Sequence, residues 1–352
     1  MRCDRWLFIP TGNNFRSMKI ALLCIVLMGM PAIALAQLTQ NATRLLRIYE
    51  DDDFFNIWGR GTDKAYSNGT LIGYRYMKFK QSRFVDNWLM PKAGKQAINV
   101  WEWNLMQIMI TPNNISDTAF NPDDYYYAGA LFARHELTSY NPLKQYSLHS
   151  EILFGVMGPL AFAEETQTFF HNLIHYQKPK GWQHQVPNAP LLNYNFTYER
   201  MLYTPRPFLE VVGSANAQAG TMVAALQAKT VIRVGKLNPY FGNTDLKTAT
   251  RNKFQVYAFG NPMFNVVFYN ALLQGGIFKW RSGDFMDLSA QQETKMKHFT
   301  VGIDYGVGLG FNRCSVIYTQ QTRSAWMRGT GKHSVGNISL LISLSKAPPP
   351  AQ

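Results

Sequence analysis

The sequence predicts an all-β fold, a transmembrane antiparallel β-barrel of about twelve strands that follows an N-terminal signal peptide. Three observations predict it. Only 16% of the 352 residues are charged while 14% are aromatic, whereas soluble domains usually have about 25% charged residues. Many segments alternate between apolar and polar residues, as barrel strands do. After residue 36, no run of about 18 apolar residues could form a membrane-spanning helix.

The N-terminus has the pattern of a secretory signal peptide. Met18 and Lys19 precede an apolar run over residues 20–30, and a small-residue cleavage motif follows at 34–36. We therefore expect residues 1–36 to be removed and the true start to be Met18. The barrel is expected to occupy residues 37–346, and a Pro-rich tail residues 347–352.

Cysteine content and net charge indicate whether the mature chain has a disulfide and which partners it favours. Cys314 alone remains after Cys3 and Cys24 are removed, so no internal disulfide is expected. The formal net charge of +13 includes +3 in the first 36 residues, which leaves +10. A basic exported protein favours anionic partners such as lipopolysaccharide or anionic outer-membrane lipids, and not nucleic acid. Alternatively, the cations lie on exposed loops without a specific ligand.

The clearest alternating segment is residues 299–309, FTVGIDYGVGL. Its alternate positions are apolar, and the positions between them are small or polar. Eleven such residues suit a tilted strand with one face in lipid. A soluble β-sandwich would also alternate, but its strands are usually only about 5 to 6 residues long. The apolar positions are Phe299, Val301, Ile303, Tyr305, Val307 and Leu309.

The same periodicity predicts twelve strands along the chain. Some of the joins between them are short and others are long, and an even strand count suits an up-and-down barrel. The joins after the first and fifth strands, residues 50–67 and 158–191, would emerge on the same side of the membrane. The expected starts are Thr43, Ser67, Ala97, Tyr127, Gln145, Leu192, Arg206, Met222, Lys253, Lys295, Asn312 and Ser334.

The first strand ends in four consecutive carboxylates, Glu50 to Asp53. Neighbouring carboxylates repel one another unless they are solvated or bind a cation, and Ca²⁺ prefers oxygen ligands. The alternative is a solvated acidic turn. Ser67 follows shortly afterwards, in Thr62–Gly69, and could be a nucleophile, an oxyanion donor or neither. It lacks the G-x-S-x-G elbow of the hydrolase fold.

Residues 158–185 form the longest stretch without two-residue alternation. Gln167, His171 and His175 lie at i, i+4 and i+8, so a helix would place them on one face. Imidazole titrates near neutral pH and can take a proton from water. The alternative is a loop or short helix whose histidines are solvated. His149 and His184 lie nearby and are further candidates for a base.

The order of several motifs resembles the LpxR family of outer-membrane lipid A 3′-O-deacylases. The similarity extends from the first strand to the last. Its motifs are Glu50-Asp51-Asp52-Asp53-Phe54-Phe55, Thr62 to Gly69, Asp124 to Gly129, Gly158-Pro159 with Gln167 and His171, and Trp182 with Gln185.

The resemblance implies a barrel that removes the 3′-linked acyloxyacyl chain of lipid A, with its active site facing the outer leaflet. His171 falls on the family's catalytic histidine, and Gln167 on the glutamine near it. Asp51 and Asp52 fall on its Asn-Asp pair, and Ser67 on its hydroxyl residue. The implied mechanism has His171 deprotonate a water while Ca²⁺, near Asp51, Asp52 and Ser67, stabilises the oxyanion.

The chain departs from the family pattern at three places. Asp51 replaces an asparagine, Gln177 replaces a glutamate, and Tyr125 and Tyr126 replace an Arg-Pro pair. Two other functions therefore stay open: a non-catalytic pore or scaffold barrel, and an outer-membrane phospholipase with a serine nucleophile. The sequence leaves the oligomeric state open.

Overall fold

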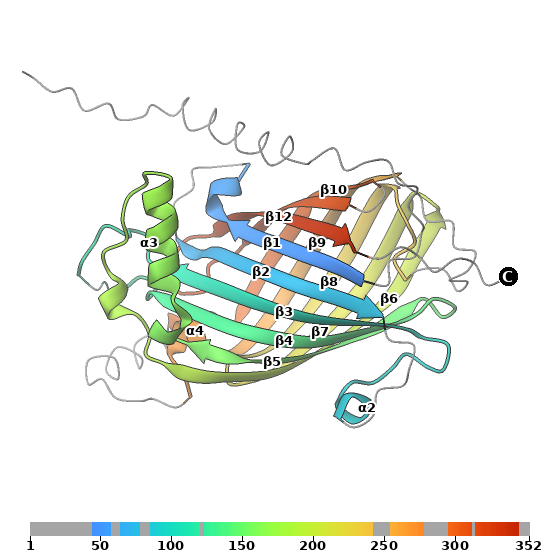
Figure 1. The fold of residues 1–352 in the computed structure, drawn as a ribbon, viewed down its shortest axis with the longest axis horizontal. Helices are drawn as coiled ribbons and strands as arrows, with labels where there is room; N and C mark the ends of the chain where they lie inside the picture. The colour runs from blue at the N-terminus through green and yellow to red at the C-terminus, as the bar shows by residue number, and fades with distance from the viewer. Residues whose placement is uncertain are drawn as a thin grey trace, which may run out of the picture. The chain divides into compact units, whose positions relative to one another are not determined.

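The computed structural model is a closed barrel of antiparallel strands in which each strand pairs with its neighbours in sequence (Figure 1). The first strand pairs with the twelfth to close the sheet. The structure describes residues 44–57, 64–77, 85–119, 121, 123–241, 254–277, 295–311 and 314–344. The expected signal peptide and Pro-rich tail lie outside the described residues.

The twelve predicted strands are confirmed, and each begins within four residues of the expected start. Most are longer than the roughly 9–11 residues that cross a membrane. They are β1 (Arg44–Asp52), β2 (Ala65–Met77), β3 (Ile98–Thr111), β4 (Ala128–Asn141), β5 (Tyr146–Met157), β6 (Ala189–Arg206), β7 (Leu209–Gly220), β8 (Val223–Lys236), β9 (Phe254–Asn270), β10 (Phe299–Phe311), β11 (Cys314–Arg323) and β12 (His333–Ser343).

Alternation along each strand separates an outer face from a lumen face. In β3, Trp103 and Leu105 are 43% and 54% exposed, while Glu102 and Asn104 are buried. The outer face is therefore apolar and the lumen face polar, as in outer-membrane barrels. In β10, five of the six predicted apolar positions are exposed, which confirms the apolar face, and Tyr305 is half-buried; the five are Phe299, Val301, Ile303, Val307 and Leu309.

The odd-numbered joins emerge at one end of the barrel, because the strands alternate in direction. Three of these joins contain the helices η1 (Asp53–Phe55), α3 (Ala163–Leu173) and α4 (Ala271–Gln274). The β5–β6 join also holds η2 (Pro159–Ala161) and η3 (Trp182–His184), whereas α2 (Val85–Leu89) lies in an even-numbered join (Figure 1). The acidic segment and the histidine segment therefore do emerge together. Within the described ranges, every helix is too short or too polar to cross a membrane.

A buried apolar cluster lies at the end of the barrel where α3 lies. Its members come from the strand ends on that side, from α4 and from five of the loops. The histidine segment expected from the sequence therefore lies at the same end of the barrel as this cluster. The cluster includes Ala65, Ile110, Tyr125, Phe132, Met157, Leu272 and Met327.

Candidate active site

Helix α3 lies against the outer wall of the barrel, over β3 and β4 (Figure 1). Gln107 shares the outer face of β3 with Leu105, because the two are two residues apart. Its Nε2 donates a hydrogen bond to the carbonyl of Ala161, just before the helix, at 2.6 Å. The segment is thus fixed outside the lumen, next to lipid-facing positions.

Close packing holds the start of the helix to the wall. A Cβ on Gly129 of β4 would lie 2.4 Å from the Cβ of Ala163, so the approach requires glycine. Ala163 also packs with Met109 of β3, Tyr127 and Trp182 in a small apolar cluster on the outer wall. This explains why the Tyr-Ala-Gly motif accompanies the histidine segment in the sequence.

His171 is buried on the wall side of α3, and its tautomer is fixed. Its Nδ1 lies 2.5 Å from the carbonyl oxygen of Gln177. A carbonyl can only accept a hydrogen bond, so Nδ1 carries the hydrogen and Nε2 is the basic nitrogen. Because the backbone of residue 177 makes this bond, the bond does not depend on which side chain that residue carries.

The other histidines have different environments. His175 lies beyond the end of α3, is exposed and has a left-handed φ of 54°, so it does not continue the face formed by Gln167 and His171. His184 is also exposed. His149 lies in β5 on the lumen face, with its Nδ1 2.8 Å from Thr138 Oγ1. Of these four histidines, His171 alone is buried.

Gln167 lies one turn before His171 and is also buried. Its Oε1 accepts a hydrogen bond from Trp182 Nε1 at 2.8 Å, which fixes the orientation of the carboxamide. Its Nε2 has no hydrogen-bond partner among the residues that the structure describes. A buried donor without a partner costs about 1–3 kcal/mol, so a bound acceptor at this nitrogen would recover that free energy.

Asp51 is buried on the lumen face of β1, where its carboxylate has three donors. Tyr49 and Tyr66 donate to Oδ2 at 2.5 and 2.7 Å, and Gln321 Nε2 donates to Oδ1 at 2.7 Å. Neighbouring residues of a strand point to opposite faces. The predicted pair of Asp51 and Asp52 is therefore divided between the two faces of the wall.

Asp52 shares the outer face with Glu50. Glu50 Oε1 accepts from Asn68 Nδ2 at 2.7 Å, and Asp52 Oδ2 lies 3.4 Å from the same nitrogen. Asp52 Oδ1 also accepts from the backbone N–H of Phe54 at 2.7 Å. Two carboxylates on one face are ligands that suit a hard cation, and Asn68 turns its amide nitrogen towards both of them. That Asp51 and Asp52 hold Ca²⁺ together stays a prediction, and the residue that shares the face of Asp52 is Glu50.

Ser67 lies where the register between β2 and β3 shifts. It is 1% exposed, and its Oγ has no hydrogen-bond partner within the described part of the chain. The residue after it, Asn68, is paired with Asp52 on one side and with Met109 on the other. Met109 is in turn paired with Gly129 under α3. One cross-strand row on the outer wall thus connects the acidic segment to the helix that carries His171.

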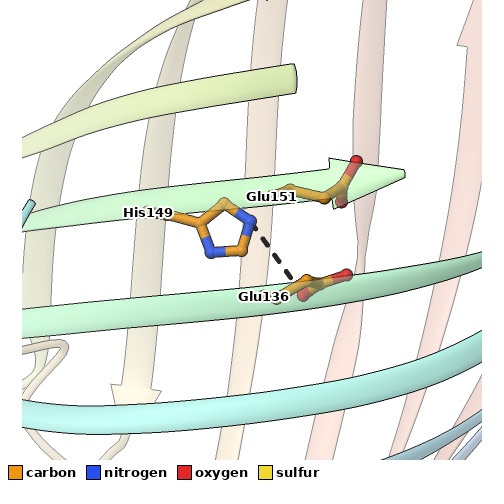
Figure 2. Close-up of side chains that lie close together, drawn as sticks. All are labelled: Glu136, His149 and Glu151. Atoms are coloured by element: carbon orange, nitrogen blue, oxygen red, sulfur yellow. Dashed lines mark ion pairs between the residues drawn. The ribbon is translucent and has the colours of Figure 1, made fainter. Parts of the chain in front are cut away.

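The lumen contains a second group of ionisable side chains, shown in Figure 2. Glu136 in β4 lies directly opposite Glu151 in β5, and His149 Nε2 is 4.0 Å from Glu136 Oε2. The three ligating atoms lie within 4.8 Å of one another, as at a metal site. However, Arg134 Nε and Nη1 lie 3.3 and 3.1 Å from the two carboxylates. The guanidinium therefore offsets part of their negative charge.

Sequence reasoning missed several residues that position the site. The hydrogen bonds from Tyr66 and Gln321 to Asp51 join different strands, so no local sequence pattern predicts them. Tyr125 replaces the family's arginine and instead packs in the apolar cluster, with its hydroxyl 2.9 Å from Thr330 Oγ1. Burial raises the pKa of the Tyr125 hydroxyl, which therefore stays neutral at physiological pH. In contrast, Tyr49 and Asp51 are two residues apart in a strand, and this spacing does predict that their side chains share one face.

The family model described as "Outer membrane protein LpxR" matches residues 20–344. The chain belongs to the LpxR family. LpxR from Salmonella typhimurium has a similar fold, with a TM-score of 0.66 and 16% identity, over 85% of this chain and 99% of that chain. Family membership and the closed barrel together support an outer-membrane location.

Other solved barrels resemble this LpxR-family chain more remotely. The β domain of the Bordetella autotransporter BrkA has a TM-score of 0.39 and 8% identity, over 86% of this chain and all of its own. The translocator domain of NalP from Neisseria meningitidis also has a TM-score of 0.39, with 7% identity over 94% and 96% of the two chains. No curated protein sequence matches the chain.

Proposed function

We propose that this LpxR-family protein is an outer-membrane hydrolase that removes the 3′-linked acyloxyacyl chain of lipid A, with its active site facing the outer leaflet. The observation that carries the proposal is the arrangement on α3. His171 has a fixed tautomer with a basic Nε2, and one turn away Gln167 offers a donor that has no partner among the described residues. Both are buried between α3 and the outer wall, on the side of the barrel that faces membrane lipid and not the lumen.

In the proposed reaction, His171 Nε2 takes a proton from a water as the water oxygen attacks the ester carbonyl carbon. The hydrogen bond from Nδ1 to the carbonyl of Gln177 stabilises the imidazolium that forms. The tetrahedral intermediate then breaks its bond to the sugar oxygen, and Nε2 returns the proton to that oxygen. The products are a free acyloxyacyl acid and a sugar hydroxyl, and no acyl-enzyme forms.

Two groups of this chain are proposed to donate to the oxyanion. Gln167 Nε2 and Ser67 Oγ are both buried and lack hydrogen-bond partners among the described residues. Donors that are preorganised in this way stabilise developing negative charge. Asp51 is assigned a positioning role, because its bond to the Tyr66 hydroxyl fixes the residue next to Ser67.

A cation is proposed to assist at the outer face of β1 and β2. Glu50 and Asp52 would hold Ca²⁺ there, and the ion would supply positive charge that favours the oxyanion. The support for this assignment is that the two carboxylates share one face, and that Asp52 lies on the cross-strand row that leads to α3.

The test is mass spectrometry of lipid A from cells that express the protein. We expect loss of a mass equal to the 3′ acyloxyacyl group. His171→Ala should abolish this loss, whereas His175→Ala, which changes an exposed histidine four residues away, should retain it. Heat-resistant migration on a gel confirms that each barrel is folded. Removal of Ca²⁺ with a chelator from purified protein should stop the reaction, and added Ca²⁺ should restore it.

Each alternative has its own outcome in the same experiment. An active, folded His171→Ala variant would contradict the proposed base. Trapping of Ser67 by an acylating inhibitor would instead indicate the serine-dependent phospholipase. Unchanged lipid A with the folded wild-type barrel and Ca²⁺ present would favour a pore or scaffold.

A further inference from the structure

Helix α3 has three distinct faces when its residues are placed at about 100° intervals. One face packs on the barrel wall and contains Ala163, Gln167 and His171, all buried. A second face is polar and exposed, with Glu164, Glu165 and Asn172. The third face, which we term the apolar face of α3, presents Phe169, Phe170 and Leu173; the half-buried Thr166 lies between them and donates its hydroxyl to the carbonyl of Phe162.

The apolar face of α3 is unusually exposed for large apolar side chains. Phe169, Phe170 and Leu173 are 62%, 50% and 64% exposed. Phe162 and Leu160, just before the helix, are also exposed. A contiguous apolar patch of this kind marks a surface that is covered by a partner or by lipid.

This patch adjoins the lipid-facing surface of the barrel. Leu105 in β3 and Phe154 in β5 are exposed on the outer wall. Gln107, which holds the start of the α3 segment, is two residues beyond Leu105, or about 7 Å along the strand. The helix therefore lies at the edge of the apolar belt, where the acyl chains meet the headgroup region.

We propose that α3 is an interfacial helix whose apolar face lies among the acyl chains of the outer leaflet. The three faces match three surroundings: barrel wall, hydrocarbon, and the water or headgroups that Glu164 and Glu165 would meet. The proposal rests on the outer-membrane location and not on the deacylase reaction. Its consequence is that the contact between α3 and the membrane determines how deep in the outer leaflet His171 lies.

The occupant is lipid and not a second protein because the patch continues the belt that already contacts lipid. Residues on the outer wall of β3 and β6, including Trp103, Leu105 and Leu192, are exposed in the same way. The described part of this face carries no charged residue that would pair with a polar partner.

The test uses fluorescence quenching in nanodiscs of dioleoylphosphatidylcholine, in which both ends of the barrel are reachable from water. An environment-sensitive dye is attached at Phe169→Cys, at Leu173→Cys, or at the control site Asn172→Cys, in protein without native cysteines. We expect blue-shifted emission, strong quenching by nitroxide-labelled lipid and weak quenching by iodide at Phe169 and Leu173. Asn172 should show the reverse.

Two outcomes would overturn the proposal. Equal quenching by iodide at all three positions would mean that the apolar face of α3 lies in water. Protection of Phe169 and Leu173 from both quenchers, with a dependence on protein concentration, would mean that a second copy of the chain covers the face. Heat-resistant migration of each labelled protein ensures that the result refers to the folded barrel, and neither outcome depends on whether lipid A is cleaved.

Discussion

The contact between Gly129 and Ala163 predicts how closely α3 must approach the barrel for activity. In Gly129→Ala, the new Cβ would lie 2.4 Å from the Cβ of Ala163. Two carbons rest at about 3.5–4.0 Å, so the helix has to withdraw by about 1 Å. The barrel itself should remain folded, because overpacking at one site costs about 1–3 kcal/mol.

A displacement of this size should affect the reaction strongly. A misplacement of about 1 Å can reduce a rate roughly 100-fold, and α3 carries both His171 and Gln167. We therefore expect Gly129→Ala to release the acyloxyacyl group about 100-fold more slowly. The assay is the initial rate of deacylation of purified lipid A, followed by mass spectrometry.

Two further variants make this prediction specific. Gly260→Ala is the matched control, because a Cβ at Gly260 in β9 would meet no atom within 4 Å. The double variant Gly129→Ala with Ala163→Gly removes the opposing Cβ and should recover most of the rate. Equal activities of Gly129→Ala and Gly260→Ala, or no recovery in the double variant, would refute the reasoning.

Three other predictions follow from contacts in the site and the lumen. Trp182→Phe removes the donor to Gln167 and should slow deacylation about tenfold, with unchanged gel migration, since one hydrogen bond contributes about 0.5–1.5 kcal/mol. Arg134→Met leaves two opposed glutamates without their cation and should destabilise the barrel by about 1.5–3 kcal/mol, lowering its melting temperature while activity persists below it. Asp52→Asn should raise the Ca²⁺ concentration for half-maximal activity more than Asp51→Asn; the opposite order would place the ion on the lumen face.

The fold was predictable because its signal is local. Residues that alternate over ten or more positions specify both the strand and its two faces, as residues 299–309 illustrate. The odd and even joins then follow from antiparallel order alone. The position of α3 on the outer wall was not predictable in this way, because it depends on Gly129 and Met109, which are remote in sequence.

The candidate site was predictable in its residue types but not in its geometry. The spacing of Gln167 and His171 placed both on one helical face, and the structure has them there. In contrast, the tautomer of His171 depends on a backbone carbonyl, which no side-chain motif encodes. The division of Asp51 and Asp52 between two faces follows from strand alternation, whereas the Ca²⁺ prediction treated the two neighbouring carboxylates as one pair.

The glutamates of the lumen also constrain how the barrel assembles. Glu102, Glu136 and Glu151 lie directly opposite one another across β3, β4 and β5. A slip of one residue between two of these strands would turn a glutamate towards lipid, and a slip of two would separate it from Arg134. The row of glutamates therefore favours one strand register. The repetitive apolar faces alone would allow several registers, and the glutamates select the one in which the sheet closes.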